Sequence, residues 1–188
     1  ITGKDLQAGK SYKLDANIEA NFYMDGVAYM SSAGTLSEII SAEDLKTISS
    51  LKIVGKINGS DIITLESMSV LKSLDLSKAN IVSGGLPYEY REVRDEDVPV
   101  YTENDVISFG MFDNFGFEEI VLPENITSIQ SYAFNNCQEL TSITIPSNVA
   151  SIGSSAFKNC TSLTSIDLPN SITAIYSETF YGCEKLQH

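Results

Sequence analysis

The sequence lacks most of the groups from which enzymes build active sites. It has no Trp and a single His, His188, which is the final residue. A Ser-His-Asp or Cys-His arrangement needs an ordered His as its base. Neither a G-x-x-x-x-G-K-S/T loop nor a G-x-G-x-x-G turn occurs, so the usual nucleotide-binding motifs are missing as well. Enzymatic function is therefore the least favoured class, and we predict no catalytic residue, no cofactor and no metal site.

Positive charge and long apolar runs are also scarce. Lys and Arg number 12 against 25 Asp and Glu, which gives a net charge of −13. Such a surface repels phosphate backbones, so nucleic acid is not an expected partner. No run approaches the roughly 18 apolar residues of a transmembrane helix, and the chain does not open on a basic segment followed by an apolar one. The protein is either cytosolic or has an export signal outside this sequence, and composition does not choose between the two.

Cysteine is rare too. Cys137, Cys160 and Cys183 are too few and too evenly spaced for the disulfide framework of a small secreted domain. With 43% hydrophobic and 20% charged residues, the composition is otherwise that of an ordinary globular domain. The even spacing of the cysteines indicates an internal repeat instead.

A repeat of 23 residues occupies the carboxyl-terminal part of the sequence. Residues 120–142 read IVLPENITSIQSYAFNNCQELTS, residues 143–165 read ITIPSNVASIGSSAFKNCTSLTS, and residues 166–188 read IDLPNSITAIYSETFYGCEKLQH. The main apolar positions around the second copy are Leu140, Ile143, Ile145, Val149, Ile152, Phe157 and Cys160. The first three fit a short strand that Pro146 ends, and the other four lie on a returning segment. Stacked copies would bury these side chains between them, which one copy alone cannot do.

The same period extends towards the amino terminus with a less regular sequence. Ile48, Leu51 and Ile53 precede Leu71, Leu74 and Leu76 by 23 positions each. Between these two strands, the run DIITLESM is predicted to form a short helix with Asp61 as its N-cap. A degenerate copy around Ile107 brings the total to roughly five copies from Ile48 onwards.

Two segments depart from the period. Residues 77–106 contain Gly-Gly, prolines and dense charge, and are predicted to form an inserted loop. Residues 1–47 lack the period and are predicted to form an N-terminal cap with one or two short helices. We expect the remainder, residues 48–188, to form one repeat domain.

The repeat unit resembles the BspA-like leucine-rich repeats of bacterial cell-surface proteins. Three tandem copies of P-x-x-I/V-x-x-I-x-x-x-A/T-F-x-x-C carry the resemblance, which is close over residues 107–188. The stretch that begins AGTLSEIISAEDLKTISS also resembles the amino-terminal part of such proteins from Bacteroidetes. Pattern and resemblance together predict an α/β fold, a right-handed leucine-rich repeat solenoid with a parallel concave β-sheet.

The resemblance also implies a function. It implies a secreted or outer-membrane-anchored protein with an adhesive or ligand-binding role, directed at a protein or glycan and in some members at host matrix proteins. A structural spacer without a ligand of its own is the competing function. The family carries no catalytic motif, and its ligand contacts vary, so no binding residue is transferred to this sequence.

Two surfaces are candidate binding sites. In an L-x-x-L-x-L strand, the residues between the apolar positions face outwards on the concave sheet. These residues are Ser73, Asp75, Glu119, Val121, Ser142, Thr144, Ser165 and Asp167. The inserted segment adds Tyr88, Tyr90 and Tyr101, because exposed loop tyrosines are a frequent recognition device. Soluble strand residues and a solvated insertion explain the same side chains without a ligand.

Two further expectations concern the cysteines and the carboxyl end. The cysteines share one phase of the repeat with Met68, so we expect buried free thiols that pack as small apolar groups. Leu186 opens another strand shortly before the sequence stops. An uncovered last repeat predicts either a longer protein or self-association through this end.

Overall fold

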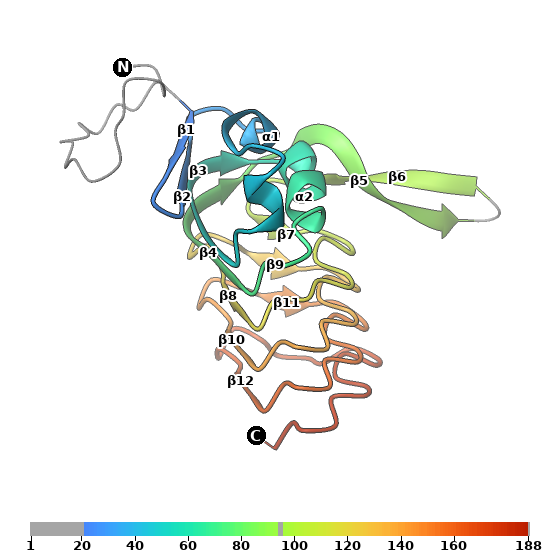
Figure 1. Cartoon of the computed structure of the whole chain (residues 1–188). Helices are drawn as coiled ribbons and strands as arrows, with labels where there is room; N and C mark the ends of the chain where they lie inside the picture. The colour runs from blue at the N-terminus through green and yellow to red at the C-terminus, as the bar shows by residue number, and fades with distance from the viewer. Residues whose placement is uncertain (1–20, 94–95, 188) are drawn as a thin grey trace.

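A seven-stranded sheet runs through the whole of the described structure (Figure 1). The computed structural model describes residues 21–93 and 96–187. In spatial order the strands are β1 (Phe22–Met24), β2 (Val27–Met30), β3 (Ser50–Ile57), β4 (Ser73–Ile81), β8 (Glu119–Val121), β10 (Ser142–Thr144) and β12 (Ser165–Asp167). The pair β1 and β2 is antiparallel, and every later pair is parallel.

The register of this sheet places equivalent residues of the sequence repeat side by side. Ser50 pairs with Ser73, and Glu119 with Ser142, which in turn pairs with Ser165. These partners are 23 positions apart. Ser73 pairs directly with Glu119, twice that distance along the chain, because the segment between them adds no strand to this sheet. A repeat fold built on a parallel sheet is thus confirmed.

A second, smaller sheet lies on the returning segments. It contains β7 (Val106–Ile107), β9 (Ser128–Ile129) and β11 (Ser151–Ile152), all parallel. Ile107, Ile129 and Ile152 point into the core, with at most 1% of their surface exposed. Each returning segment is therefore fixed by main-chain bonds to its neighbour as well as by its apolar side chains.

Tight turns with left-handed backbone follow the small strands. One series of such positions is Asn114, Asn136, Asn159 and Gly182, with φ values of 61°, 56°, 59° and 76°. Asn and Gly tolerate this conformation better than other residues do. This explains why Asn or Gly directly precedes each cysteine of the repeat.

The first returning segment is an α-helix instead, α2 (Gly59–Glu66). Its N-cap is Asn58, whose side chain accepts a hydrogen bond from Ser60 N at 3.0 Å. The predicted N-cap, Asp61, is wrong: this residue lies one turn later and its carboxylate accepts from Asn58 N at 2.9 Å. The two residues form a capping box, a pattern that a single acidic residue before an apolar run does not reveal.

The Asp61 carboxylate also ties α2 to the segment before it. Asp61 is fully buried and accepts hydrogen bonds from Gly34 N at 2.6 Å and Leu36 N at 2.9 Å. Leu36 begins the short helix α1 (Leu36–Ile39), and a 3-10 helix η2 (Asp44–Lys46) follows. One carboxylate thereby serves three backbone donors from two segments.

Phenylalanine rings stack along the axis of the carboxyl-terminal repeats. Successive ring centroids of Phe112, Phe134, Phe157 and Phe180 are 5.4, 5.1 and 5.7 Å apart, with nearly parallel rings. The first three rings are fully buried. Offset aromatic stacking adds to the burial of large apolar surfaces, so this column is the main core of these repeats.

The cysteines form a second column beside the rings. The thiols of Cys137 and Cys160 are fully buried, and each donates to a Phe carbonyl of the preceding repeat at 3.1 Å. Cys183 is half-buried and donates to Phe157 O at 3.0 Å. All three are free, so the prediction of buried free thiols is confirmed for Cys137 and Cys160.

The segment predicted as an inserted loop contains a β-hairpin that projects from the side of the repeats (Figure 1). Residues 77–81 continue β4, and β5 (Gly84–Val93) pairs with β6 (Glu96–Thr102) in antiparallel fashion. The prediction of a loop is therefore wrong. It rested in part on Pro87 and Pro99, because proline is disfavoured inside most strands. A two-stranded hairpin tolerates proline, because each of its strands has a free edge.

The amino-terminal segment adds strands to the main sheet as well as short helices. Strands β1 and β2 join through Asp25 and Gly26, whose φ values of 50° and 81° are those of a tight hairpin turn. Strand β2 then pairs in parallel with β3. Residues 1–20 of the predicted cap and the final residue, His188, lie outside the described residues. The boundary of the cap at residue 48 stays a prediction.

Candidate functional site

The eight residues predicted to face outwards do share one face of the main sheet. The parallel register aligns Ser73, Glu119, Ser142 and Ser165 in one row, and Asp75, Val121, Thr144 and Asp167 in the next. In β8 and β10 these residues are exposed on either side of a buried isoleucine. We call these two rows the sheet face.

The amino-terminal end of the sheet face is occupied by an ion pair. Lys52 Nζ is 2.5 Å from Asp75 Oδ2, and Ser77 N donates to the other carboxylate oxygen at 2.8 Å. Partial burial opposes ionisation of Asp75, but the bonds from Lys52 and Ser77 outweigh it and lower the pKa of the carboxyl group. Both carboxylate oxygens of Asp75 therefore already bond to other residues of the protein.

The side chains in the rest of the sheet face differ from Asp75 in this respect. Within the part of the chain that the structure describes, Glu119, Ser142, Thr144, Ser165 and Asp167 make no side-chain hydrogen bond. Val121 stands among them with 50% of its surface exposed. Small hydroxyl and carboxylate groups around one apolar side chain leave a polar surface open to a partner.

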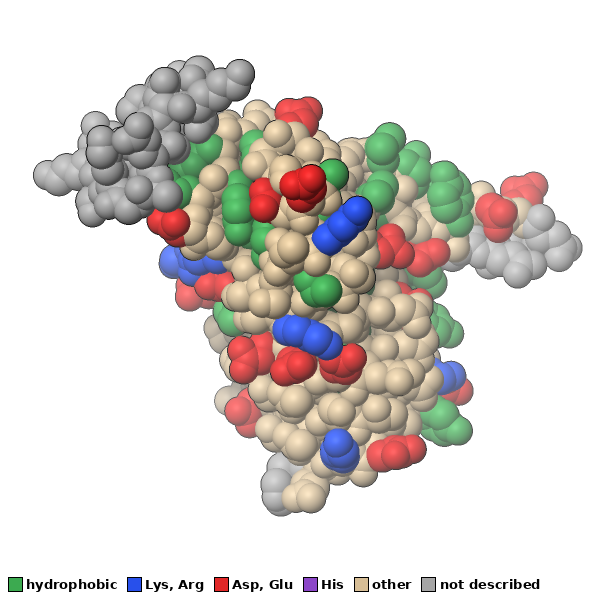
Figure 2. All heavy atoms as spheres, viewed as in Figure 1, with side chains coloured by type: hydrophobic (Ala, Val, Ile, Leu, Met, Phe, Trp, Pro, Cys, Tyr) green, Lys and Arg blue, Asp and Glu red, His purple; other side chains and the backbone are tan. Residues whose placement is uncertain are grey.

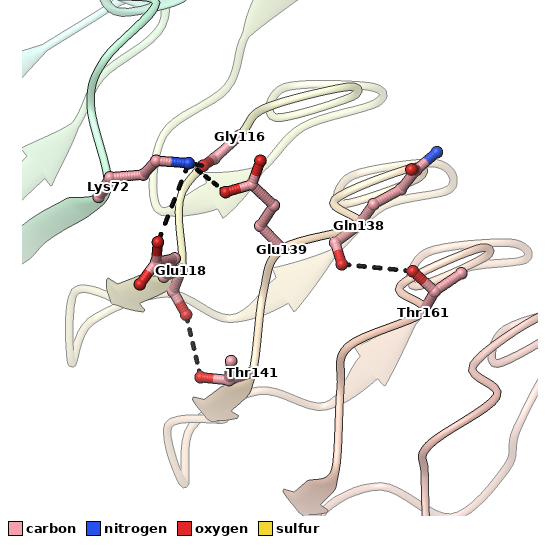
Figure 3. A network of polar contacts seen from close by, with 7 residues as sticks. All are labelled: Lys72, Gly116, Glu118, Gln138, Glu139, Thr141 and Thr161. Carbon is pink, nitrogen blue, oxygen red and sulfur yellow. Dashed lines mark hydrogen bonds and ion pairs between the residues drawn. The ribbon is translucent and has the colours of Figure 1, made fainter.

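A charged clamp borders the sheet face where the strands begin (Figure 3). Lys72 Nζ lies 3.3 Å from Gly116 O and 3.9 Å from Glu118, and forms an ion pair with Glu139. The Thr141 hydroxyl donates to Glu118 O at 3.2 Å. One Lys thus joins three successive repeats. Sequence reasoning missed this clamp, although Lys72, Glu118 and Thr141 share one phase of the repeat.

The three predicted tyrosines differ in their surroundings. The Tyr88 hydroxyl donates to Phe109 O at 2.8 Å, and burial strongly raises the pKa of this phenol. Tyr90 and Tyr101 are 57% and 46% exposed. Tyr88 therefore anchors the hairpin to the repeats, and two of the three tyrosines remain open to a ligand. Figure 2 shows hydrophobic side chains gathered over the base of the hairpin.

A groove of about 760 Å³ lies between the hairpin and the repeats. Strand β6 and the residues after it contribute Val98, Pro99, Val100, Tyr101, Thr102 and Glu103, and the repeats contribute Phe109, Ser128, Ile129, Gln130, Ser131, Ser151, Gly153 and Tyr176. Sequence reasoning missed this groove, because a hairpin is needed to form it. Its signal in the sequence was the serine that precedes the inward isoleucine, at Ser128 and again at Ser151.

Two other kinds of site were sought among the described residues. No group of three or more His, Cys, Asp or Glu side chains converges there in a way that suits a metal ion. No helix within the same ranges has the length and apolar character needed to cross a membrane.

Comparison with known families gives one finding. A family model described as a BspA type leucine rich repeat region matches residues 105–188 in six copies. The match covers the segment that contains the strands from β7 to β12. A search of curated proteins found no match to the chain.

Proposed function

We propose that the protein is a ligand-binding module that recognises a protein or glycan through its sheet face, because residues 105–188 match the model of the BspA type leucine rich repeat region. Leucine-rich repeats commonly mediate protein binding, and the family is generally a non-enzymatic binding or scaffold module. The observation that carries the proposal is the row of exposed, uncommitted polar side chains from Glu119 to Asp167.

The proposal extends to location and to the finer fold. BspA-type repeats are often extracellular or surface-associated. We propose an adhesive role at the cell surface of a member of the Bacteroidetes, with host extracellular matrix among the ligands. We also propose that the repeats form a right-handed solenoid of 23-residue units whose concave side is the sheet face, a proposal that the 23-residue register supports.

Surface plasmon resonance against matrix proteins, mucins and glycans tests the binding role. Glu119→Arg should weaken capture of any sheet-face ligand by about tenfold or more, since it places a long cation in the middle of the contact. Glu124→Arg changes the same charge on an exposed residue of the same repeat outside the sheet face, and serves as the matched control. Silence across the whole panel would favour a structural spacer.

Self-association through the last repeat is a further part of the proposed interactions. Leu168 and Ile175 are 38% and 50% exposed there. Apolar side chains of this size are usually covered in a partner interface when they cluster. Sedimentation velocity between low and high protein concentration tests this, and a monomer throughout would contradict it.

A further inference from the structure

The groove beside the hairpin has the properties of a ligand site that is separate from the sheet face. Its volume of about 760 Å³ falls within the roughly 300–1,000 Å³ of small-ligand sites in proteins. Tyr101 comes from the hairpin and Tyr176 from the last repeat, and both rings are about half exposed. The groove therefore combines two aromatic surfaces from distant parts of the sequence.

Polar groups in the groove are held in fixed positions. Gln130 accepts from Phe109 N at 2.9 Å and donates to one carboxylate oxygen of Glu103 at 2.8 Å. This leaves the second oxygen of Glu103 without a hydrogen bond among the described residues. Ser128 and Ser151 are paired in the register of the small sheet. Their hydroxyls also make no hydrogen bond among the described residues.

The hairpin is built against binding a peptide as an added strand. Tyr90 pairs with Pro99, and because Pro99 has no N–H this pair cannot exchange main-chain bonds. The main-chain groups of both residues therefore point to the outer edges of the hairpin. On one edge Pro99 has no N–H to donate, and on the other Tyr90 N already donates to the Glu89 carboxylate at 2.8 Å. Edges blunted in this way resist pairing with another strand.

Charge narrows the ligand class further. Among the described residues that line the groove there is no Lys or Arg, whereas Glu103 is one of them, and the whole chain has a net charge of −13. Anionic ligands such as uronic acids, sialosides or sulfated sugars would be repelled. A neutral pyranose instead offers weakly positive C–H groups to the negative face of a tyrosine ring and hydroxyls to carboxylate, amide and serine groups.

We propose that this groove binds a neutral oligosaccharide, with sugar rings stacked on Tyr101 and Tyr176 and sugar hydroxyls bound by Glu103, Ser128 and Ser151. The site is independent of the sheet face. A ligand for one surface does not require a ligand for the other.

Calorimetric titration with neutral linear hexasaccharides of glucose, mannose and galactose tests the proposal. At least one hexasaccharide should bind, and Tyr101→Ala and Tyr176→Ala should each raise its Kd by about tenfold because one stacked ring is lost. Tyr101→Phe keeps the ring and should stay within about threefold of the wild type. Tyr181→Ala removes an exposed tyrosine outside the groove and should leave the Kd unchanged.

Several results would overturn the proposal. These are the absence of binding by every neutral hexasaccharide, tighter binding of sialylated or sulfated glycans, or a Kd insensitive to both alanine variants. Binding of an extended peptide in the groove, competing with the sugar and lost in Tyr101→Ala, would assign the site to peptides instead. Glu119→Arg should leave hexasaccharide binding intact, so failure of the sheet-face proposal is recognised separately.

Discussion

The amino-terminal repeats (residues 50–81) and the carboxyl-terminal repeats (residues 119–186) build the same sheet in different ways. Strands β3 and β4 have 8 and 9 residues, whereas β8, β10 and β12 have three each. The first return is the helix α2, and the later returns are tight turns with left-handed residues. One sheet register therefore tolerates two kinds of connection.

The two parts also differ in what secures the connection. A buried carboxylate, Asp61, gathers backbone donors around the start of α2. Stacked rings and thiols fill the interior of the later repeats, and Asn159 donates to Asn136 at 2.9 Å from one turn to the next. The first return thus depends on satisfied hydrogen bonds, and the later ones depend mainly on identical side chains that recur in every repeat.

The largest expected effect is on the aromatic column. Phe134→Ala should lower the free energy of unfolding by about 3–5 kcal/mol, because it empties a fully buried site and removes two stacked neighbours. Phe180→Ala should cost clearly less, since Phe180 is only half-buried and has one stacked neighbour. Urea unfolding followed by circular dichroism measures both, and equal losses would show that the column is not continuous.

Removing the carboxylate of Asp61 should be the next largest effect. Asp61→Asn replaces one acceptor oxygen with an amide group that faces N–H donors, which should cost about 2–3 kcal/mol. Asp44→Asn, at an exposed carboxylate bonded to Ser41, is the control and should cost less than about 1 kcal/mol. A loss in Asp61→Asn no larger than in this control would contradict the role given to Asp61.

The same variant has an expected pH dependence. Burial raises the pKa of Asp61 against the opposing effect of its backbone hydrogen bonds. A raised folded-state pKa gives stability that is complete below the unfolded value and is lost as pH rises through the folded value. The stability difference between the wild type and Asp61→Asn should therefore narrow as pH is raised from about 3 to 7.

A smaller effect is expected at the left-handed turns. Asn159→Ala should lower the free energy of unfolding by about 1–2 kcal/mol, because alanine is strained at a φ of 59° and the bond to Asn136 is lost. Asn159→Gly loses the same bond without the strain and should recover part of the stability. Thermal unfolding compares the two, and an alanine variant as stable as the glycine variant would argue against backbone strain.

The smallest effect is expected at the charged clamp. Lys72→Met should cost no more than about 1 kcal/mol, because exposed ion pairs are weak even when one cation serves two carboxylates. The difference from the wild type should vanish in about 1 M NaCl, where exposed charges are screened. Lys46→Met, at an exposed Lys without a carboxylate partner among the described residues, should leave stability unchanged at any salt concentration.

The sequence predicted the repeating interior well. Leu140, Ile143 and Cys160 are buried as their spacing indicated, since a side chain that recurs at one phase must meet its own copies. The outward placement of Ser142 and Thr144 was predicted for the same reason. Periodic positions are predictable because their neighbours are repeats of themselves.

The features that do not repeat were harder to predict. The Asp25-Gly26 turn is a strong hairpin signal that was overlooked, because its flanking strands are only 3 and 4 residues long. The 84–102 hairpin contradicts the local rule for proline, and the partners of Asp61 come from residues about 25 positions earlier. Such contacts depend on the folded arrangement and leave no period in the sequence.

The direction of the main-chain hydrogen bonds between strands has a mechanical consequence. In the main sheet these bonds run from one repeat to the next, along the line that joins β1 to β12. A pull applied between the two ends of the described chain therefore loads the bonds of one repeat boundary at a time, as in opening a zipper. Each repeat of 23 residues would release up to about 80 Å of extended chain as it detaches. The molecule should therefore lengthen under load in a few low-force steps, one for each repeat that detaches, so that the force on an attached molecule rises gradually.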